Sequence, residues 1–326
     1  MTLTPPRERF FCSDAARSRG DDNAATASRT DVWILVELPG PWGKRPLLDG
    51  GLPLAVQANL LDAIEKIPRL RVVFIRRRFE TRSGCRVYIG RSAPRPWVIF
   101  ADLAAIEDVA LLQFRDLTRG KAADGWTVSE KPVVLVCTHG QRDSCCGRRG
   151  FPLYDALRTA EPLDVWQCSH IGGDRFAANA VVLPWGLYYG PVEPRDAEAL
   201  TESIVCGEIL LDSYRGRSTV PRLGQAAETF VRRAAGIKGR DTLTITFRAT
   251  LPDGRAHVHL RDDAGTLHEV TLEPYVSAEV ALLTCTASST CPVVQYRMVE
   301  YRATPSDASD PSSAFGTFSP LTRGEG

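Results

Sequence analysis

Residues 131–160, KPVVLVCTHGQRDSCCGRRGFPLYDALRTA, are the stretch that decides the fold of this chain. A short run of β-branched apolar residues leads through a polar turn into a segment with the apolar spacing of a helix. Cys137, His139, Cys145 and Cys146 lie at this junction. Thiols at such a place serve as nucleophiles, disulfide partners, metal ligands or small core residues, and the surrounding sequence narrows the choice.

The composition of the chain excludes several classes of partner. Its 326 residues have room for two or three domains, and its 40 basic and 39 acidic residues leave no net field that would favour nucleic acid or an anionic membrane. The apolar runs are too short to span a bilayer, and residues 1–22 lack the apolar core of a signal peptide. We therefore expect a cytoplasmic protein, in which nine cysteines favour metal or redox chemistry over a disulfide framework.

Strands alternate with helices on both sides of the cysteine-rich turn, which predicts an α/β fold with an open sheet. Residues 31–125 show the order strand, helix, three strands, helix, with the last helix expected over residues 104–114. Residues 131–212 repeat that order, with helices expected over residues 151–160 and 194–211. The matched order indicates two copies of one unit.

The remaining segments differ in character. Residues 1–30 are polar and rich in small side chains, so we expect them to pack loosely. Residues 213–303 begin with an amphipathic helix and continue with period-two alternation around two turns, which predicts a small antiparallel β domain. Residues 304–326 have the Pro, Ser and Asp content of a disordered tail.

A second pair of donors follows the next strand of the second unit. In CSHIGGDRFAANAVVLP, residues 168–184, His170 and Asp174 are four positions apart around a Gly-Gly that frees the backbone to turn. Cys137 and Cys146 come from the upstream loop. Two pairs of donors brought to one end of a sheet can supply four ligands to one metal centre.

These motifs resemble those of known iron–sulfur proteins. The VCT strand end, a second cysteine nine residues later and the LYYG hairpin at residues 187–190 are similar to thioredoxin-like two-iron ferredoxins. More closely, CTHGQRDSCCG, CSHIGGDRFAANAVVLP and LYYG look like the sucrase/ferredoxin-like family, over roughly residues 31–305. Members of that family often carry a second histidine where this chain has Asp174.

The resemblance implies both a fold and a cofactor. It implies a thioredoxin-like ferredoxin domain over residues 131–212, preceded by a related unit without ligands over residues 31–125. It also implies a [2Fe-2S] cluster used for one-electron transfer or redox sensing. The implied cofactor and metal ligands are Cys137, Cys146, His170 and Asp174. An electron carrier that meets an unidentified redox protein is then expected rather than a stand-alone catalyst, and the oligomeric state is not indicated.

The chemistry of this ligand set is sound. Ferric iron prefers thiolates and accepts imidazole on one iron of a two-iron cluster, and a carboxylate is a hard but electrostatically suitable donor. Arg148, Arg149 and Arg175 are expected to surround the cluster and offset its charge.

The sequence is also compatible with two alternative functions and with two alternative ligands. A thioredoxin-like thiol enzyme would use Cys145 or Cys146 at a helix N-terminus, although such enzymes prefer C-x-x-C. A structural zinc site would use the same Cys and His donors. Cys168 is the substitute fourth ligand for Asp174, and Cys145 the substitute for Cys146. No carboxylate pair suited to glycoside hydrolysis occurs in the site region.

The other candidate donors are expected to be ordinary residues. His139 is predicted to be a hydrogen-bonding loop residue. Buried or loop positions without ligand roles are predicted for Cys12, Cys85, Cys206, Cys285 and Cys291.

Overall fold

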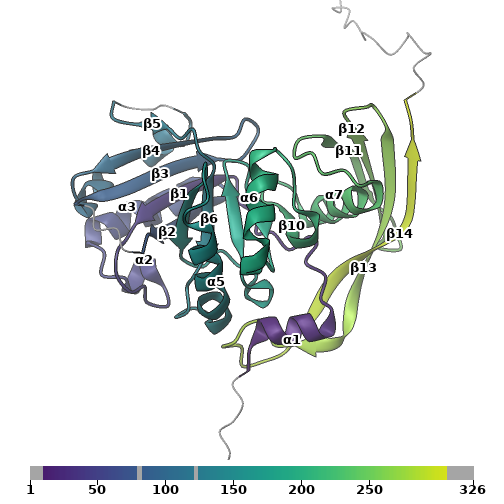
Figure 1. Ribbon diagram of the computed structural model, residues 1–326, viewed down its shortest axis with the longest axis horizontal. Helices are drawn as coiled ribbons and strands as arrows, with labels where there is room; N and C mark the ends of the chain where they lie inside the picture. Colours follow the sequence, from purple (N-terminus) through teal and green to yellow (C-terminus); the bar gives the residue numbers. More distant parts are fainter. Residues whose placement is uncertain (1–9, 79–82, 121–123, 307–326) are drawn as a thin grey trace, which may run out of the picture.

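The computed structural model describes residues 10–78, 83–120 and 124–306. It contains a ten-stranded mixed sheet and a four-stranded antiparallel sheet, which lie side by side (Figure 1). The fold is therefore α/β with an added antiparallel β region, as the sequence predicts. In the described part of the chain, no helix combines the length and the apolar character needed to cross a membrane.

The ten-stranded sheet consists of two units with the same topology. The first has the order β2-β1-β3-β4 and the second the order β7-β6-β8-β9. In both, the first pair of strands is parallel and the other pairs are antiparallel. This match supports the duplication expected from the sequence. The strands of the two units are β1 (Val32–Glu37), β2 (Leu70–Arg76), β3 (Cys85–Arg91), β4 (Trp97–Leu103), β6 (Val133–Cys137), β7 (Asp164–Cys168), β8 (Ala180–Leu183) and β9 (Leu187–Tyr189).

A short antiparallel pairing between β2 and β7 joins the two units. Ile75 pairs with Cys168 and Arg76 with Gln167. Beyond this pairing, Ser169 donates its backbone N–H to the carbonyl of Phe74 at 2.8 Å and accepts from the N–H of Phe74 through its hydroxyl at 3.0 Å. The first unit therefore fixes the backbone immediately before His170. Two further strands, β5 (Thr127–Val128) and β10 (Tyr214–Arg217), extend the outer edges.

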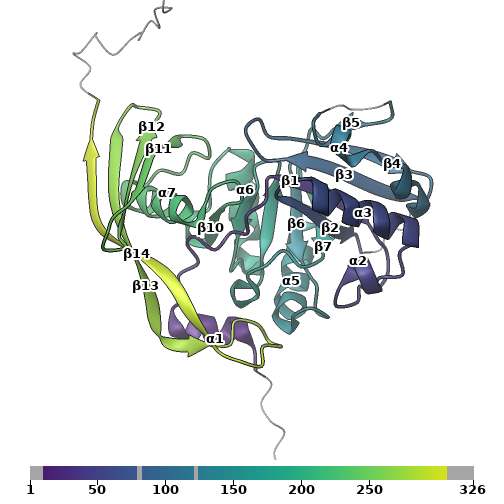
Figure 2. The same ribbon diagram turned by 180° about the vertical axis from the view of Figure 1, so that it is seen from behind.

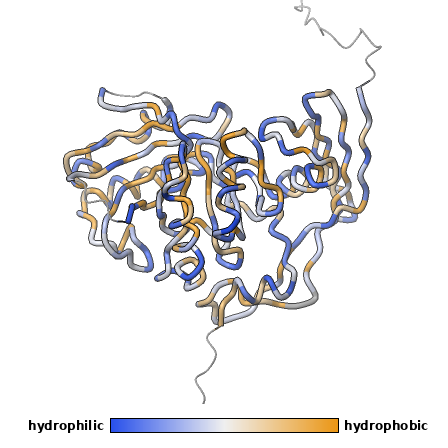
Figure 3. The backbone as a smooth tube through the Cα atoms, viewed as in Figure 1, coloured by the Kyte–Doolittle hydropathy of each residue, from blue (hydrophilic) through white to orange (hydrophobic). Residues whose placement is uncertain are grey.

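The large sheet curls instead of lying flat and open. Trp33 on β1 and Tyr188 on β9 are separated by four intervening strands, yet their ring centroids are only 6.3 Å apart. Neighbouring strands lie about 4.8 Å apart, so a flat sheet would hold these two strands about 24 Å apart. Apolar side chains from both units fill the inside of the curl, and the hydrophobic residues concentrate along the central strands (Figure 3).

The longer helices pack on the outside of the curled sheet, and three of the expected helices differ from the expectation. The helix expected from residue 151 begins earlier, at Ser144, so Cys145 and Cys146 lie in its first turn; Pro152 lies inside it. The helix expected over residues 104–114 is a 3-10 helix followed by one α-turn, and the one expected over residues 194–211 is shorter. The elements of this layer are α2 (Pro46–Asp49), α3 (Leu54–Lys66), η1 (Ile106–Leu111), α4 (Phe114–Leu117), α5 (Ser144–Leu157), η2 (Asp174–Phe176), η3 (Pro194–Asp196), α6 (Ala197–Val205) and η4 (Leu211–Ser213).

The C-terminal region is the predicted helix with an antiparallel meander. Helix α7 (Arg222–Ala235) packs small apolar residues against the sheet. Strands β13 and β14 run beyond the small sheet as a long hairpin whose far end reaches helix α1 (Cys12–Arg19; Figure 2). The predicted disordered tail lies almost wholly outside the described residues, which end at residue 306. The strands are β11 (Leu243–Thr250), β12 (Ala256–Asp262), β13 (Leu267–Ala281) and β14 (Cys291–Thr304).

The expectation that residues 1–30 pack loosely is wrong for the part that the structure describes. Residues Cys12–Arg19 form helix α1, whose Cys12, Ser13 and Ala16 are buried. The small side chains that suggested a loose segment are what allow it to lie close against its neighbours.

One glycine sets the distance between α5 and the sheet. A Cβ atom on Gly150 would overlap the carbonyl oxygen of Cys137, the last residue of β6. The variant Gly150→Ala is expected to lower the free energy of unfolding by about 1–3 kcal/mol, because the new methyl group must displace backbone. Urea unfolding followed by circular dichroism measures this change.

Gly90→Ala is the matched control, since Gly90 is also buried but its nearest neighbour would be 3.4 Å from the new Cβ atom. A similar loss of stability in both variants would contradict the close approach at Gly150.

Candidate metal centre

The carboxyl ends of β6 and β7 bring two donor loops together. Because these strands are parallel neighbours, Cys137 at the end of β6 lies directly opposite Cys168 at the end of β7. The loop after β6 leads into α5 and its Cys146. The loop after β7 carries His170 and reaches Asp174, the first residue of η2.

All four predicted ligands meet at this edge of the sheet. The donor atoms of Cys137, Cys146 and His170 lie within 4.8 Å of one another. Asp174 Oδ1 accepts from Cys146 Sγ at 3.2 Å and lies 3.0 Å from His170 Nδ1. Both thiols and the carboxylate are buried, whereas the His170 side chain is 24% exposed. The site is thus closed on the protein side and reaches solvent through the imidazole.

The imidazole of His170 carries an unused donor atom. Its Nδ1 is buried and has no aligned hydrogen-bond partner, although the Asp174 carboxylate is close. A buried polar atom without a partner costs free energy, so native structures rarely leave one. A ring nitrogen that makes no aligned hydrogen bond and lies beside two thiols and a carboxylate fits a donor set for iron or zinc.

The pKa values of the Cys137 and Cys146 thiols are shifted in opposite directions. Hydrogen bonds from Cys146 and then from Cys168 lower the pKa of Cys137 well below its usual value. The hydrogen bond to Cys137 and burial raise the pKa of Cys146. For His170, burial lowers the pKa, but Asp174 and Cys137 together outweigh it and raise the pKa to about 9. Without a metal, these interactions favour the thiolate form of Cys137 and the protonated form of His170.

Two glycines and a buried arginine shape the second loop. Gly172 and Gly173 have φ angles of +94° and +84°, so the predicted Gly-Gly turn is confirmed. The guanidinium of Arg215 donates to the carbonyl of Gly172 at 3.1 Å and to Asn179 Oδ1 at 2.7 Å. A side chain on Gly173 would overlap this guanidinium. Sequence reasoning missed Arg215, since nothing around it in DSYRGR distinguishes it from a surface arginine.

His139 orients the site and is a hydrogen-bonding loop residue, as predicted. Its Nδ1 accepts the backbone N–H of His170 at 3.2 Å, so its Nε2 donates to the carbonyl of Gly43 at 2.7 Å. Both ring nitrogens are thereby used. On the other side, Arg71 donates to the carbonyl of His170 at 2.9 Å.

The adjacent cysteines of α5 face different surroundings. Cys146 contacts Asp174, whereas Cys145 Sγ lies 3.7 Å from Cys12 Sγ and 3.3 Å from Cys285 Sγ. Cys168 is buried and hydrogen-bonds to Cys137, whereas Asp174 contacts Cys146 and His170.

The three arginines expected around the cluster point elsewhere. Arg148 and Arg149 pair with Asp14 on α1, and Arg175 lies 3.5 Å from Asp21. Their closeness to the ligands in the sequence predicts a place at the site. In the fold, Asp14 on helix α1 and Asp21 just after it attract them instead.

Burial weighs against the thiol-enzyme alternative. A hydrogen bond from Cys12 is the main cause that lowers the pKa of Cys145 to about 6, which would suit an attacking thiolate. However, Cys145 and Cys146 are 0% and 1% exposed, so a disulfide substrate cannot reach either sulfur.

Two cavities approach the site from outside, and His170 lines both. One, of about 370 Å³, also contains Asp174, Arg215 and Tyr296 of β14. The other, of about 280 Å³, lies on the side of Phe74 and Arg142. The imidazole is therefore the part of the site that a partner can approach.

Parts of the chain are similar to known proteins. The chain is similar to "Altered inheritance of mitochondria protein 32" of Meyerozyma guilliermondii, with 35% identity over 95 residues, 26% of this chain and 34% of the relative. The protein of the same name from Clavispora lusitaniae is 36% identical over 101 residues, 28% of this chain and 37% of the relative. The matches thus span about a third of the length of these curated relatives.

Among solved structures, a thioredoxin-like [2Fe-2S] ferredoxin from Aquifex aeolicus matches with 21% identity and a TM-score of 0.25. The match covers 28% of this chain and 97% of that one, and so low a score carries no argument by itself.

The profile of the family described as sucrase/ferredoxin-like matches residues 24–216. Because this match covers more than half of the chain, the protein belongs to the sucrase/ferredoxin-like family.

Proposed function

We propose that this protein binds a [2Fe-2S] cluster through Cys137, Cys146, His170 and Asp174 and uses it for one-electron transfer or redox sensing. The observation that carries this proposal is the convergence of the donor atoms of Cys137, Cys146 and His170 within 4.8 Å, with Asp174 Oδ1 3.0 Å from His170 Nδ1. Membership of the sucrase/ferredoxin-like family supports the same assignment.

The donor set suits ferric iron. Two cysteines supply thiolates, which iron in such clusters prefers, and histidine is an accepted replacement. The cluster would supply a centre that gains and loses a single electron. The protein contributes a buried pocket and two backbone loops held by His139 and Arg215.

The surface around His170 is the proposed contact with a redox partner. It is the most exposed of the four residues, and cavities open on both sides of it. A partner protein that docks there would approach the site more closely than at any of the buried donors. The cytoplasmic location expected from the sequence is part of this proposal. The name of the fungal relatives refers to mitochondria, so subcellular fractionation tests it.

Replacing either thiol should prevent assembly. In Cys137→Ser and Cys146→Ser, the visible absorption and the bound iron and sulfide should be lost, because a hydroxyl is a poor replacement for a thiolate on iron. Absorption spectra and iron and sulfide analysis of anaerobically purified protein measure this. Cys206→Ser is the control, since Cys206 is exposed and outside the site. Full iron and sulfide in Cys137→Ser would overturn the assignment.

Two variants show whether Asp174 or Cys168 is the fourth ligand. Asp174→Ala should give a labile cluster with an altered spectrum, because Asp174 contacts both Cys146 and His170. Cys168→Ser should leave the spectrum unchanged, because Cys168 is a hydrogen-bond partner of the Cys137 thiol rather than a contact of the other two donors. Electron paramagnetic resonance of the reduced protein compares them. The reverse pattern would assign the fourth position to Cys168.

The charge of the site predicts its reduction potential. Two ferric ions and two sulfides carry +2, so four thiolates give −2, two thiolates with two neutral histidines give 0, and the proposed set gives −1. An electron enters more easily when the site is less negative. The potential should therefore lie between the values of four-cysteine clusters, about −400 mV, and of two-histidine centres, roughly −150 to +300 mV.

The potential should also fall as pH rises over the range in which His170 titrates. Reduction makes the site more negative, so the reduced form holds the imidazole proton more tightly than the oxidised form. Asp174→His removes a negative charge and should raise the potential. Voltammetry across pH checks both statements. A pH-independent potential near the four-cysteine value would exclude His170 as a ligand.

A further inference from the structure

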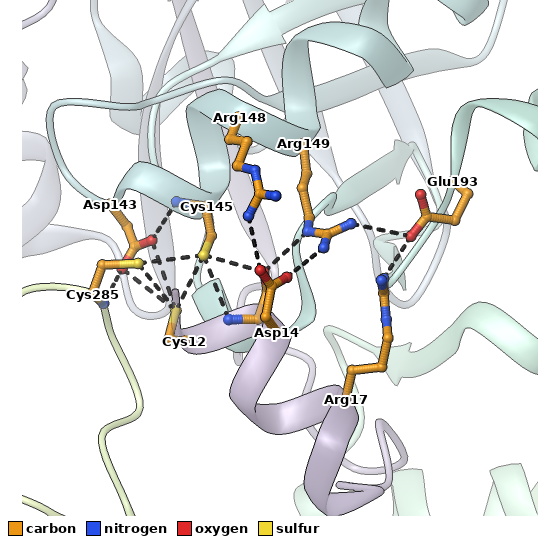
Figure 4. Close-up of polar contacts among 10 residues, drawn as sticks. Cys12, Asp14, Arg17, Asp143, Cys145, Arg148, Arg149, Glu193 and Cys285 are labelled. Carbon is orange, nitrogen blue, oxygen red and sulfur yellow. Dashed lines mark hydrogen bonds and ion pairs between the residues drawn. The ribbon is translucent and has the colours of Figure 1, made fainter. Parts of the chain in front are cut away.

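A second group of thiols lies on the other side of the first turn of α5, formed by Cys12, Cys145 and Cys285 (Figure 4). The sulfur of Cys145 is 3.3 Å from that of Cys285 and 3.7 Å from that of Cys12, and the sulfurs of Cys12 and Cys285 are 3.6 Å apart. The three residues come from helix α1, helix α5 and the connection between β13 and β14. The sequence predicts no ligand role for Cys12 and Cys285, whereas this geometry places both sulfurs within reach of one metal ion.

Asp143 adds a carboxylate to the three thiols. All four donor groups lie within 4.8 Å of one another, and the two oxygens of Asp143 are 3.7 and 3.8 Å from the sulfur of Cys12. One oxygen accepts the backbone N–H of Cys145 at 2.8 Å and the other that of Cys285 at 2.6 Å. Each oxygen keeps a lone pair for a further partner.

The spacing of the sulfurs matches a tetrahedral metal site. Zinc–sulfur bonds of about 2.3 Å place the sulfurs of a tetrahedron about 3.8 Å apart. The separations of 3.3–3.7 Å between the three thiols are close to this value. A disulfide would join one pair of sulfurs at about 2.05 Å, and the third thiol would have no partner. Three nearly equidistant sulfurs with a carboxylate favour a metal.

Hydrogen-bond donors are aimed at the sulfur of Cys145. Ser13 donates to it from its backbone N–H at 3.4 Å and from its hydroxyl at 3.1 Å. Arg149 in turn donates from Nε to the Ser13 hydroxyl at 3.1 Å. Donors directed at sulfur stabilise the thiolate, which is the form that binds metal.

Burial indicates a structural rather than a catalytic centre. Cys12, Asp143 and Cys145 are buried, and Cys285 is partly buried. Four protein donors leave no open position, as is usual for structural zinc.

We propose that Cys12, Asp143, Cys145 and Cys285 form a structural zinc site that is separate from the proposed iron–sulfur site. One Zn²⁺ with three thiolates and one carboxylate gives the site a charge of −2, and each ligand thiol that is still protonated releases its proton to solvent on binding. The positive charges of Arg148 and Arg149, which lie beside this group, offset part of it (Figure 4). Zinc would thus tie α1 and the far end of the β13–β14 hairpin to the turn that presents Cys146.

The test uses the full chain with Cys137→Ser and Cys146→Ser, so that the first site cannot bind metal through its thiols. Titration with Zn²⁺ and with Co²⁺ should show one bound ion per chain, with a thiolate-to-cobalt charge-transfer band. Adding Cys12→Ser or Cys285→Ser should weaken binding by about tenfold or more, because even outer partners of a metal site cost that much. Cys291→Ser is the matched control, since Cys291 follows the same connection but is exposed.

Two results would overturn the proposal. One is unchanged zinc affinity when Cys12 or Cys285 is replaced. The other is metal-free protein that fails to bind zinc and contains a disulfide among these three cysteines by mass spectrometry. If the double variant lacks a native circular dichroism spectrum, zinc content is compared between Cys12→Ser and Cys291→Ser in the otherwise unchanged chain. There, only Cys12→Ser should lose zinc, and equal contents would overturn the proposal. Iron content is independent of these outcomes, so failure here leaves the proposed function untouched.

Discussion

The antiparallel pairing of β2 with β7 is the interaction on which the rest of the large sheet depends. It joins two units of the same topology and continues into the contacts between Phe74 and Ser169. Because those contacts fix the backbone just before His170, the ligand-free unit takes part in building the site. The curl that brings Trp33 to Tyr188 follows from joining two twisted sheets edge to edge.

The first turn of α5 organises the chemistry. Successive residues of an α-helix point about 100° apart, so Cys145 and Cys146 cannot face the same site. Cys146 turns toward the carboxyl ends of β6 and β7, and Cys145 turns toward α1 and the hairpin connection. The contact of Gly150 with the Cys137 carbonyl holds this turn close to the sheet. Two groups of donors can therefore lie back to back across one helical turn.

The buried side chain of Arg215 connects the N-terminal segment to the loop after β7. Arg215 is almost fully buried and donates to the carbonyl oxygen and the hydroxyl of Thr26, as well as to Gly172 and Asn179. Removing a partner from such a buried cation is costly, because its charge is then left unsatisfied. The segment that looked loosely packed is thus tied to the loop that carries His170 and Asp174.

The sequence by itself determined the α/β class, the repeated order of elements and the donors that meet at the ends of β6 and β7. Those features depend on neighbours along the chain: apolar alternation, a Gly-Gly turn, and two loops after adjacent parallel strands. Tertiary structure alone decided that Cys12 and Cys285 join Cys145, that Arg215 lies beneath the second loop, and that Arg148 and Arg149 face Asp14. Those contacts join residues 36 to 273 positions apart. No local pattern encodes such pairings, because they form only when the packed sheet brings distant segments together.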